Sequence, residues 1–372
     1  MGVNERTTVS RESIRDNIGA VFLGVFGATL VVDLLLKLAG VEVGILGGEL
    51  SIGRLTGNFW DGILNGLLIG LAGIGLSMTY SILTFANFSH GDLVTVGGFT
   101  GWGIAYLIAG WGVVPASILL LVRPGRASSP GEIGAHVVST PGAILAGLVF
   151  ATIFTALAAV VIDRLVYRPM RDRSGISLLI ASIGVALALR YVVQFVYGAR
   201  RRGIPASVDS EINLVVATVD AHDLTLIVAS LSLMLGLHLL LQRTKLGTAM
   251  RAMADNKDLA LITGIPTERV VTATWVVGGG LAGAAGYLTV MTRGVIAFDF
   301  GWLLLLLIFA AVILGGIGSI YGAIAGGLII GMVFSLSTIW IPADFNEAAA
   351  FAAMILALLF RPEGLFGGVS TA

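Results

Sequence analysis

The chain contains no cysteine, which excludes disulfides and thiol chemistry but does not fix a cellular compartment. Charged residues are also scarce, at 12% of 372 residues, whereas a soluble domain has about 25%. Hydrophobic residues reach 56%, and the 51 glycines allow helices to approach closely in lipid. This composition predicts a polytopic membrane protein, and the net charge of zero gives no indication of a nucleic-acid partner.

Two motifs of enzyme chemistry are missing as well. The pattern G-x-x-x-x-G-K-[ST] does not occur, so the chain has no P-loop for phosphates, and H-E-x-x-H is absent. The four histidines lie far apart in the sequence, at positions 90, 136, 222 and 238. We therefore predict no catalytic residue, no metal site and no cofactor.

Ten apolar segments are candidate spans, which predicts an all-α polytopic membrane protein with about ten transmembrane helices, eight or nine also being compatible. The segments are 18–40, 62–85, 93–122, 139–162, 176–197, 223–241, 270–292, 302–315, 321–340 and 346–360. The third contains Pro115, which predicts a kinked helix or a helix followed by a re-entrant piece. The eighth and tenth are short for a crossing of roughly 20 residues, which predicts tilted or broken helices.

The distribution of Lys and Arg predicts the orientation. With the N-terminus inside and alternating spans, the inside segments carry thirteen of the 22 cationic residues and the outside segments seven. The main exception is the cluster 200–202, which falls on an outer loop. Both termini are therefore predicted to be cytoplasmic.

The sequence also contains a repeat at an offset of 210 residues, in which Gly70–Gly73 (GLAG) recurs as Gly280–Gly283. The matched pairs further along are Thr79 and Thr289, Phe88 and Phe298, Gly91 and Gly301, and Leu93 and Leu303. The two copies lie five predicted spans apart, so they cross in opposite directions. This predicts two pseudo-symmetric inverted halves, with broken or re-entrant helices and a substrate path between them.

The whole chain, 1–372, is predicted to be a single transmembrane domain, because no segment has the composition of a separate soluble domain. Its predicted parts are the N-terminal tail, first span and outer loop (1–59), the first-half core (60–197), the outer loop (198–222) and the second-half core (223–367), which includes the cytoplasmic loop 242–269.

The Gly-rich helix before residue 86 ends in the polar sequence NFSHGD (87–92), directly followed by another apolar stretch. Polar groups at membrane depth are costly unless they line a cavity or bond to protein. One interpretation is that nearby backbone satisfies them at a helix break. The other is that they shape a partly hydrated translocation path, shared with the equivalent segment of the second repeat. The residues predicted for this path are Asn87, Phe88, Ser89, His90, Asp92, Phe298, Asp299 and Phe300.

Other ionisable residues lie inside predicted spans. Asp33 and Lys37 are four residues apart on the first span and are expected to pair with each other. Arg190 shares a helical face with Gln194, and a structural pairing inside the bundle is favoured over substrate binding. Two G-x-x-x-G spacings within 322–331 predict close helix packing.

The longest predicted cytoplasmic connection, 242–269, contains a short helix. Asp255 is predicted to cap this helix, with Asp258 at its third position. Gly264, followed by Pro266, is predicted to end it. Its faces carry small and apolar side chains among charges, and such a helix can dock in a groove on another protein. The alternative is a solvated interfacial loop.

Four patterns resemble the permease subunits of branched-chain amino acid ABC importers. NFSHGD after a Gly-rich helix resembles the signature of this family, and the loop matches its pattern RTxLGxxxRAxxxNxxxAxxxGI. The chain also has a similar Gly-rich turn before a late helix, and near its end it contains RPEGLFG (361–367). The matches run from about 60 to 367, and residues 1–59 and 123–138 show little that can be assigned to the family.

The resemblance implies a permease subunit in the cell membrane of a prokaryote, importing branched-chain amino acids or a related amino acid, amide or urea. The implied partners are a second permease subunit (a homologous chain or a copy of this one), two ATP-binding cassette ATPase subunits, an extracytoplasmic solute-binding protein and the lipid bilayer. Because the chain lacks a P-loop, ATP hydrolysis belongs to a partner and the chain itself is not an enzyme. The residues implied for the ATPase-coupling loop are Arg251, Ala252, Ala254, Asp255, Asn256, Asp258, Ala260 and Gly264. The alternative function is a stand-alone secondary transporter or channel for a small polar solute.

Overall fold

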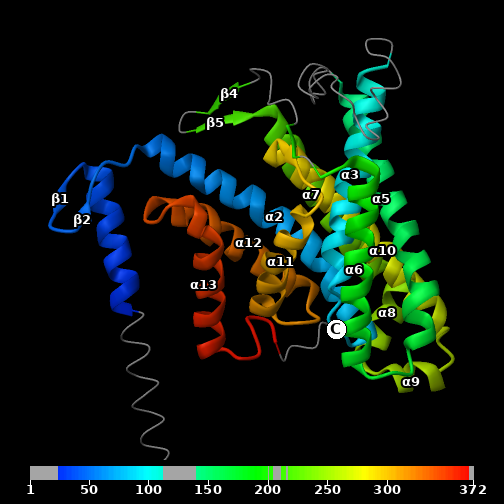
Figure 1. Ribbon diagram of the computed structural model, residues 1–372. Helices are drawn as coiled ribbons and strands as arrows, with labels where there is room; N and C mark the ends of the chain where they lie inside the picture. Colours follow the sequence, from blue (N-terminus) through cyan, green and yellow to red (C-terminus); the bar gives the residue numbers. More distant parts are fainter. Residues whose placement is uncertain (1–23, 112–139, 200, 204–210, 215–216, 368–372) are drawn as a thin grey trace, which may run out of the picture. The chain divides into compact units, whose positions relative to one another are not determined.

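The computed structural model describes residues 24–111, 140–199, 201–203, 211–214 and 217–367 (Figure 1). The predicted kink at Pro115 and the linker 123–138 lie outside these residues. The chain divides into two compact units, Met1–Gly57 and Asn58–Ala372. This division falls close to the boundary predicted at residue 59, and the single transmembrane domain stays a prediction.

The first unit contains the predicted intramembrane ion pair. Its described elements are a helix over residues 24–39 and the antiparallel strands β1 (Glu42–Val43) and β2 (Leu46–Gly47). Lys37 Nζ lies 2.6 Å from Asp33 Oδ2, and the backbone N–H of Gly47 donates to Asp33 Oδ1 at 2.7 Å. The predicted pairing of Asp33 with Lys37 is therefore confirmed.

The long helices coincide with the predicted spans. They are α2 (Ile52–Leu83), α3 (Ser89–Ala109), α5 (Pro141–Ile162), α6 (Gly175–Tyr197), α7 (Ala221–Arg243), α10 (Thr267–Arg293), α11 (Phe300–Gly315), α12 (Ile320–Leu336) and α13 (Asn346–Phe360). Two shorter helices, α8 (Lys245–Asp255) and α9 (Lys257–Ile262), lie between α7 and α10.

The remaining elements are short. The helical ones are a π-helical stretch at Asp163–Tyr167 and 3-10 turns at Arg168–Met170, Ser337–Ile339 and Ala343–Phe345. Two antiparallel strand pairs join β3 (Arg202–Gly203) to β6 (Val295–Ile296) and β4 (Glu211–Leu214) to β5 (Ala217–Asp220).

The predicted all-α polytopic class is confirmed. In the described part of the chain, eight helical segments are long and apolar enough to cross a membrane, and the shorter α11 is also apolar. Each of the ten predicted spans contains a helix. The number of ten crossings stays a prediction, because α11 and the helix over 24–39 are shorter than a crossing of roughly 20 residues. Most of α2, α3, α10 and α11 is buried, whereas little of α6 and α13 is, so the first four form the core.

Glycines set the closest helix contacts of this core. A Cβ atom on Gly97 of α3 would collide with the backbone of Gly283 in α10. A Cβ on Gly331 of α12 would collide with the backbone of Gly66 in α2, and one on Gly327 would lie 2.5 Å from the backbone of Gly70. Small residues are needed where helices approach this closely in lipid. The packing predicted from the G-x-x-x-G spacings is therefore confirmed.

The sequence repeat corresponds to a structural relation between two helix pairs. At the offset of 210, the end of α2 corresponds to the end of α10, and α3 begins one residue before the equivalent of the start of α11. A Cβ on Gly91 would lie 2.5 Å from the carbonyl oxygen of Gly301 and 2.8 Å from Cβ of Leu305. A Cβ on Gly301 would in turn meet the carbonyl oxygen of Gly91 and the side chain of Thr95, the equivalent of Leu305. Such reciprocal contacts are what a local two-fold axis between equivalent residues produces.

Candidate functional site

The link between α2 and α3 is a sharp helix break inside the bundle. The chain leaves α2 through Thr84, whose φ of 56° is uncommon for a residue other than glycine. Asn87 Oδ1 then accepts hydrogen bonds from the backbone N–H of Ser89 at 3.1 Å and from Ser89 Oγ at 2.7 Å. An Asn side chain that bonds the backbone two residues later stabilises such a turn. The polar residues here therefore organise the break itself.

Tyr167, from the π-helical stretch after α5, holds this link in place. Its hydroxyl donates to Asn87 Oδ1 at 3.2 Å and lies 2.8 Å from Ser89 Oγ. Its ring stacks on Trp275 of α10 at a centroid distance of 5.1 Å and an interplanar angle of 3°. On the other side, the backbone N–H of Phe88 donates to Ser182 Oγ of α6 at 3.0 Å. Three other helical segments therefore fix the position of the link.

His90 is buried against α2. Its Nε2 lies 2.9 Å from the carbonyl oxygen of Ala72, and because a carbonyl only accepts, Nε2 carries the hydrogen. Gly75 leaves room for the ring, since a Cβ there would lie 3.0 Å from His90 Cε1. The interpretation that backbone satisfies this histidine at a helix break is supported by this geometry.

Asp92 forms a bidentate ion pair with Arg190 of α6. Arg190 Nε lies 3.1 Å from Asp92 Oδ1, and Arg190 Nη2 lies 3.0 Å from Oδ2. The Asp92 side chain is fully buried, and that of Arg190 is 14% exposed. The guanidinium also lies over the ring of Trp302 in α11, 4.6 Å from its centroid. Both neighbours desolvate and fix the cation, which confirms the predicted structural pairing of Arg190 within the bundle.

The corresponding residues of the second repeat are mostly apolar, and three of them are aromatic. Phe298 and Asp299 are half-buried, and Phe300 is buried, with its ring against Gly98 of α3. Phe88 lies 6.2 Å from Trp302 between ring centroids, so the two repeats meet as predicted.

The polar groups of the first link do not face a hydrated cavity. Asn87, Ser89, His90 and Asp92 are each at most 1% exposed, and each bonds to protein groups. Their role, and that of the aromatic residues, in a translocation path stays a prediction. Sequence reasoning missed Tyr167, Ser182 and Trp275 as partners, because they lie on distant segments. The pairing of Asp92 with Arg190 was not predicted either, although their opposite charges could have indicated it.

The connection between α7 and α10 contains two helices, and one predicted cap is wrong. Thr244 Oγ1 accepts from the N–H of Gly247 and caps α8, and Asn256 Oδ1 accepts from the N–H of Leu259 at 2.9 Å and caps α9. Asp255 is not the cap, because its backbone still belongs to α8, whereas Asn256 is extended (φ −157°, ψ 103°) as an N-cap requires.

The end of this helix agrees better with the prediction. Asp258 occupies the second position of α9 and not the third, since the cap is shifted by one residue. Gly264 follows the helix in a left-handed conformation (φ 83°), so the predicted stop is confirmed.

The predicted coupling residues divide into two faces. Ala260 is buried and Arg251 and Ala252 are half-buried, whereas the others point to solvent. The exposed members are Ala254, Asp255, Asn256, Asp258 and Gly264. Next to them, α9 exposes three large apolar side chains, which we call the α9 patch: Leu259 (58% exposed), Leu261 (61%) and Ile262 (82%). Exposed apolar residues grouped in this way mark interaction sites, and Leu261 and Ile262 were not singled out from the sequence.

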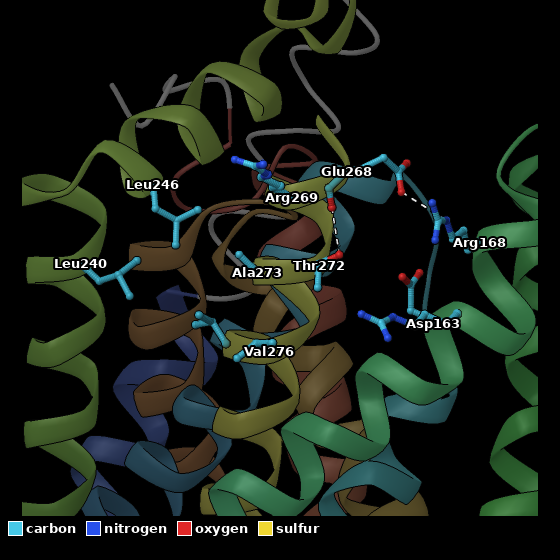
Figure 2. Close-up of a pocket in the computed structure, with 11 residues that line it drawn as sticks. Asp163, Arg168, Leu240, Leu246, Glu268, Arg269, Thr272, Ala273 and Val276 are labelled. Carbon is cyan, nitrogen blue, oxygen red and sulfur yellow. Dashed lines mark hydrogen bonds and ion pairs between the residues drawn. The ribbon is translucent and has the colours of Figure 1, made fainter. Parts of the chain in front are cut away.

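An ion network joins the start of α10 to the end of α5. Arg171 donates to Asp163 Oδ2 at 2.8 Å and to Glu268, which also lies 3.4 Å from Arg168. Burial opposes the charge on Arg171, but the hydrogen bonds to Asp163 and Glu268 outweigh it and raise the pKa of this guanidinium above its usual value. Figure 2 shows Asp163, Arg168 and Glu268 of this network in the lining of a pocket to which α7 and α8 also contribute. Glu268, at the start of α10, is thus tied to the segment that carries Tyr167.

Comparison with known proteins identifies the family. The family described as "Branched-chain amino acid transport system / permease component" matches residues 58–360. The permease protein LivH of the high-affinity branched-chain amino acid transport system of Salmonella typhimurium is 30% identical, with 83% of this chain and 94% of the relative covered. The corresponding BraD of Pseudomonas aeruginosa is 31% identical (82% and 94% covered), and a probable LivH of Methanocaldococcus jannaschii is 29% identical (82% and 90%). No solved structure matches this chain. The chain therefore belongs to the family of permease components of branched-chain amino acid transport systems.

Proposed function

We propose that this chain is the membrane-spanning permease subunit of an ATP-binding-cassette importer that takes branched-chain amino acids into the cell. Its relatives are named as permease proteins of branched-chain amino acid transport systems. The chain has no P-loop, so in this proposal two ATPase subunits supply the energy. A second permease subunit and an extracytoplasmic solute-binding protein complete the importer, with both termini of this chain in the cytoplasm.

The α9 patch is the observation that carries this proposal. Its three apolar side chains point away from the bundle, on a segment whose neighbours are charged. A short helix with apolar side chains on its outer face is suited to a groove on another protein. A stand-alone transporter has no comparable need for an exposed apolar patch outside its spans.

A contiguous set of contacts leads from this patch to the α2–α3 link. Helix α10 begins five residues after α9, and its Glu268 bonds to Arg171, beside the end of α5. Further along α10, Trp275 stacks on Tyr167, and the hydroxyl of Tyr167 bonds to Asn87. A displacement of α10 by a partner therefore reaches the link through packed groups. Such proximity is an argument from structure, and measured coupling has to support it.

The link also offers groups that suit an amino acid. Among the described residues, Asn87 Nδ2 and Trp275 Nε1 are buried donors without an acceptor. Buried donors are rarely left unpaired, so they are available to a carboxylate when the link opens. Phe88 and Phe298 provide an apolar wall for a branched side chain. In this proposal the path runs between the two repeats.

The experiment reconstitutes the complete importer in proteoliposomes and measures uptake of radiolabelled leucine and co-purification of the ATPase subunits. Ile262→Ser, Asp255→Lys and Gly264→Phe are expected to lower both, because each changes the exposed face of the α9 segment. Ile317→Ser is the matched control, since Ile317 is 50% exposed and lies in the turn between α11 and α12. Unchanged uptake and co-purification in all three variants would contradict the proposal.

The same system separates the two functions considered. ATP-independent leucine uptake by this chain alone supports a secondary transporter or channel. Uptake that requires ATP, the ATPases and the binding protein supports the importer. Competition of leucine uptake by isoleucine, valine, glutamine and urea then identifies the substrate class.

A further inference from the structure

A pocket of about 650 Å³ lies where α5 and α7 end and α10 begins. Figure 2 shows Leu240 and Leu246 on one side of it and Asp163 and Arg168 on the other, with α10 between them. Its lining on α10 extends from Glu268 to Val277, which is about 14 Å along a helix. The volume lies within the range of about 300–1,000 Å³ that is usual for ligand pockets.

One end of the pocket carries more cations than anions. Four arginines and two carboxylates lie at this end: Arg164, Arg168, Arg171 and Arg269, with Asp163 and Glu268. Arg171 bonds to both carboxylates, and Arg168 bonds to Glu268. In the part of the chain that the structure describes, Arg164 and Arg269 form no ion pair. Four cations against two anions leave a net charge of +2, which favours an anionic ligand.

The other end of the pocket is apolar. Its lining there consists of Leu240, Leu246, Ala273, Val276 and Val277. Val276 is 44% exposed, so this wall is open and not filled by other side chains. An inorganic anion would leave the apolar wall uncovered, whereas a ligand with a hydrocarbon chain would cover it.

The apolar side chains that precede the pocket on α5 are exposed. Val161 of α5 is 52% exposed and Leu157 is 60% exposed. Arg164 and Arg168 follow Val161 by three and seven residues, in the π-helical stretch and the 3-10 turn that continue from α5. The cationic end therefore lies next to the end of an exposed apolar span, which ends at Met170.

We propose that this pocket binds an anionic phospholipid, with its phosphate between Arg164 and Arg269 and an acyl chain along Ala273, Val276 and Val277 of α10. Basic pockets between the ends of transmembrane helices are suited to phospholipid headgroups. A bound lipid would connect α5 with α7 and α10. The last two helices precede and follow the α8–α9 segment in the chain. The proposal depends on the pocket alone and not on the transported substrate.

Native mass spectrometry of the detergent-solubilised full chain tests this proposal by counting bound molecules. The probes are dioctanoylphosphatidylglycerol, dioctanoylphosphatidylcholine and inorganic phosphate, all at the same concentration. We expect phosphatidylglycerol to bind in preference to both others. Equal binding of phosphatidylcholine, or binding of phosphate alone with the same affinity, overturns the proposal.

Variants locate the site. A surface arginine contributes about 1 kcal/mol to binding of anionic lipid, or roughly fivefold in affinity. Arg164→Gln with Arg269→Gln is therefore expected to weaken phosphatidylglycerol binding about thirtyfold. The control is Arg173→Gln with Lys257→Gln, which removes two exposed cations outside the pocket and should leave binding unchanged. Equal losses in both double variants would mean nonspecific charge attraction and would overturn the site.

The apolar wall is tested without a change of charge. Ala273→Trp fills the pocket and should abolish phosphatidylglycerol binding, whereas Ala188→Trp, at an exposed position of α6, should preserve it. Circular dichroism confirms that each variant is folded. If Arg164→Gln with Arg269→Gln keeps lipid binding but loses the ATPase subunits, the surface belongs to a protein partner and the lipid proposal is wrong.

Discussion

The α2–α3 link and the α10–α11 link occupy equivalent positions in the two repeats, but their chemistry differs. Both retain glycine where they meet, at Gly91 and Gly301, and both carry phenylalanine three residues earlier. The first link is otherwise polar (Asn87, Ser89, His90, Asp92), whereas the second has Ala297, Asp299, Phe300 and Trp302 at the same positions. The repeats therefore share what the close contact requires and differ in the residues that contact the surrounding helices.

Arg190 shows what this difference accomplishes. It bonds to Asp92 of the first link and stacks on Trp302, the equivalent residue of the second. One cation thus contacts both copies of one repeat position, through its charge on one side and its face on the other. A symmetric pair of aspartates would leave one carboxylate without this partner. The asymmetry allows a buried charge to be fully compensated at a two-fold contact.

The largest expected effect comes from breaking the ion pair between Asp92 and Arg190. Asp92→Ala leaves Arg190 buried and unpaired, which should destabilise the protein by about 3–5 kcal/mol. Thermal unfolding in detergent measures the loss. Asp92→Leu combined with Arg190→Met removes both charges and should recover much of it, because no unpaired charge remains in the bundle. The single variants Asp92→Leu and Arg190→Met complete a double-mutant cycle that isolates the pair. If the double variant is as unstable as Asp92→Ala with Arg190 intact, the ion pair is not the cause.

The close backbone contact that both repeats share is tested at Gly91 and Gly301. Gly91→Ala and Gly301→Ala each force the backbones apart, and overpacking of this kind costs about 1–3 kcal/mol. Gly184→Ala in α6 is the matched control, since a Cβ there has nothing within 4 Å. Because the contacts are reciprocal, both core variants should lower the melting temperature by similar amounts. A loss in one of them only would argue against a local two-fold axis.

The helices were predictable from the sequence because hydropathy is a local property. Each predicted span contains a helix, and Asp33 pairs with Lys37 because a spacing of four places them together. The cap of α9 was assigned one residue too early, since Asp255 and Asn256 both suit a cap and only the backbone conformation distinguishes them.

The site was less accessible to sequence reasoning. NFSHGD indicated buried polar groups, but their partners Tyr167 and Arg190 lie about 80 and 98 residues later. A sequence gives the cost of burying Asp92 and not the identity of the group that offsets it. Leu261 and Ile262 were missed for a related reason, because an exposed apolar residue looks like a buried one until its surroundings are known.

Tyr167 anchors the polar link and has no counterpart on the aromatic one. Tyr167→Phe keeps the stack on Trp275 but removes the hydroxyl between Asn87 and Ser89, which should cost about 1 kcal/mol. Tyr80→Phe is the control, because Tyr80 is half-buried and its hydroxyl makes no hydrogen bond in the described residues. We expect a small drop in melting temperature and a larger drop in leucine uptake for Tyr167→Phe. Equal behaviour of the two variants would contradict the anchoring role.

The last prediction concerns the direction in which α10 crosses the membrane. The cysteine substitutions that test it are not expected to change stability. The distribution of Lys and Arg predicts that α10 crosses outward, so positions before and after it lie on opposite sides of the membrane. Lys257 in α9 and Val295 after α10 are both exposed, and the native chain has no cysteine to interfere. An impermeant thiol reagent applied to intact cells should label Val295→Cys at once and Lys257→Cys only after permeabilisation. Asp172→Cys, in the exposed turn between α5 and α6, should behave like Lys257→Cys because both lie on the predicted cytoplasmic side. Labelling of Lys257→Cys in intact cells with protection of Val295→Cys would reverse the orientation, and labelling of both from one side would mean that α10 does not cross the membrane.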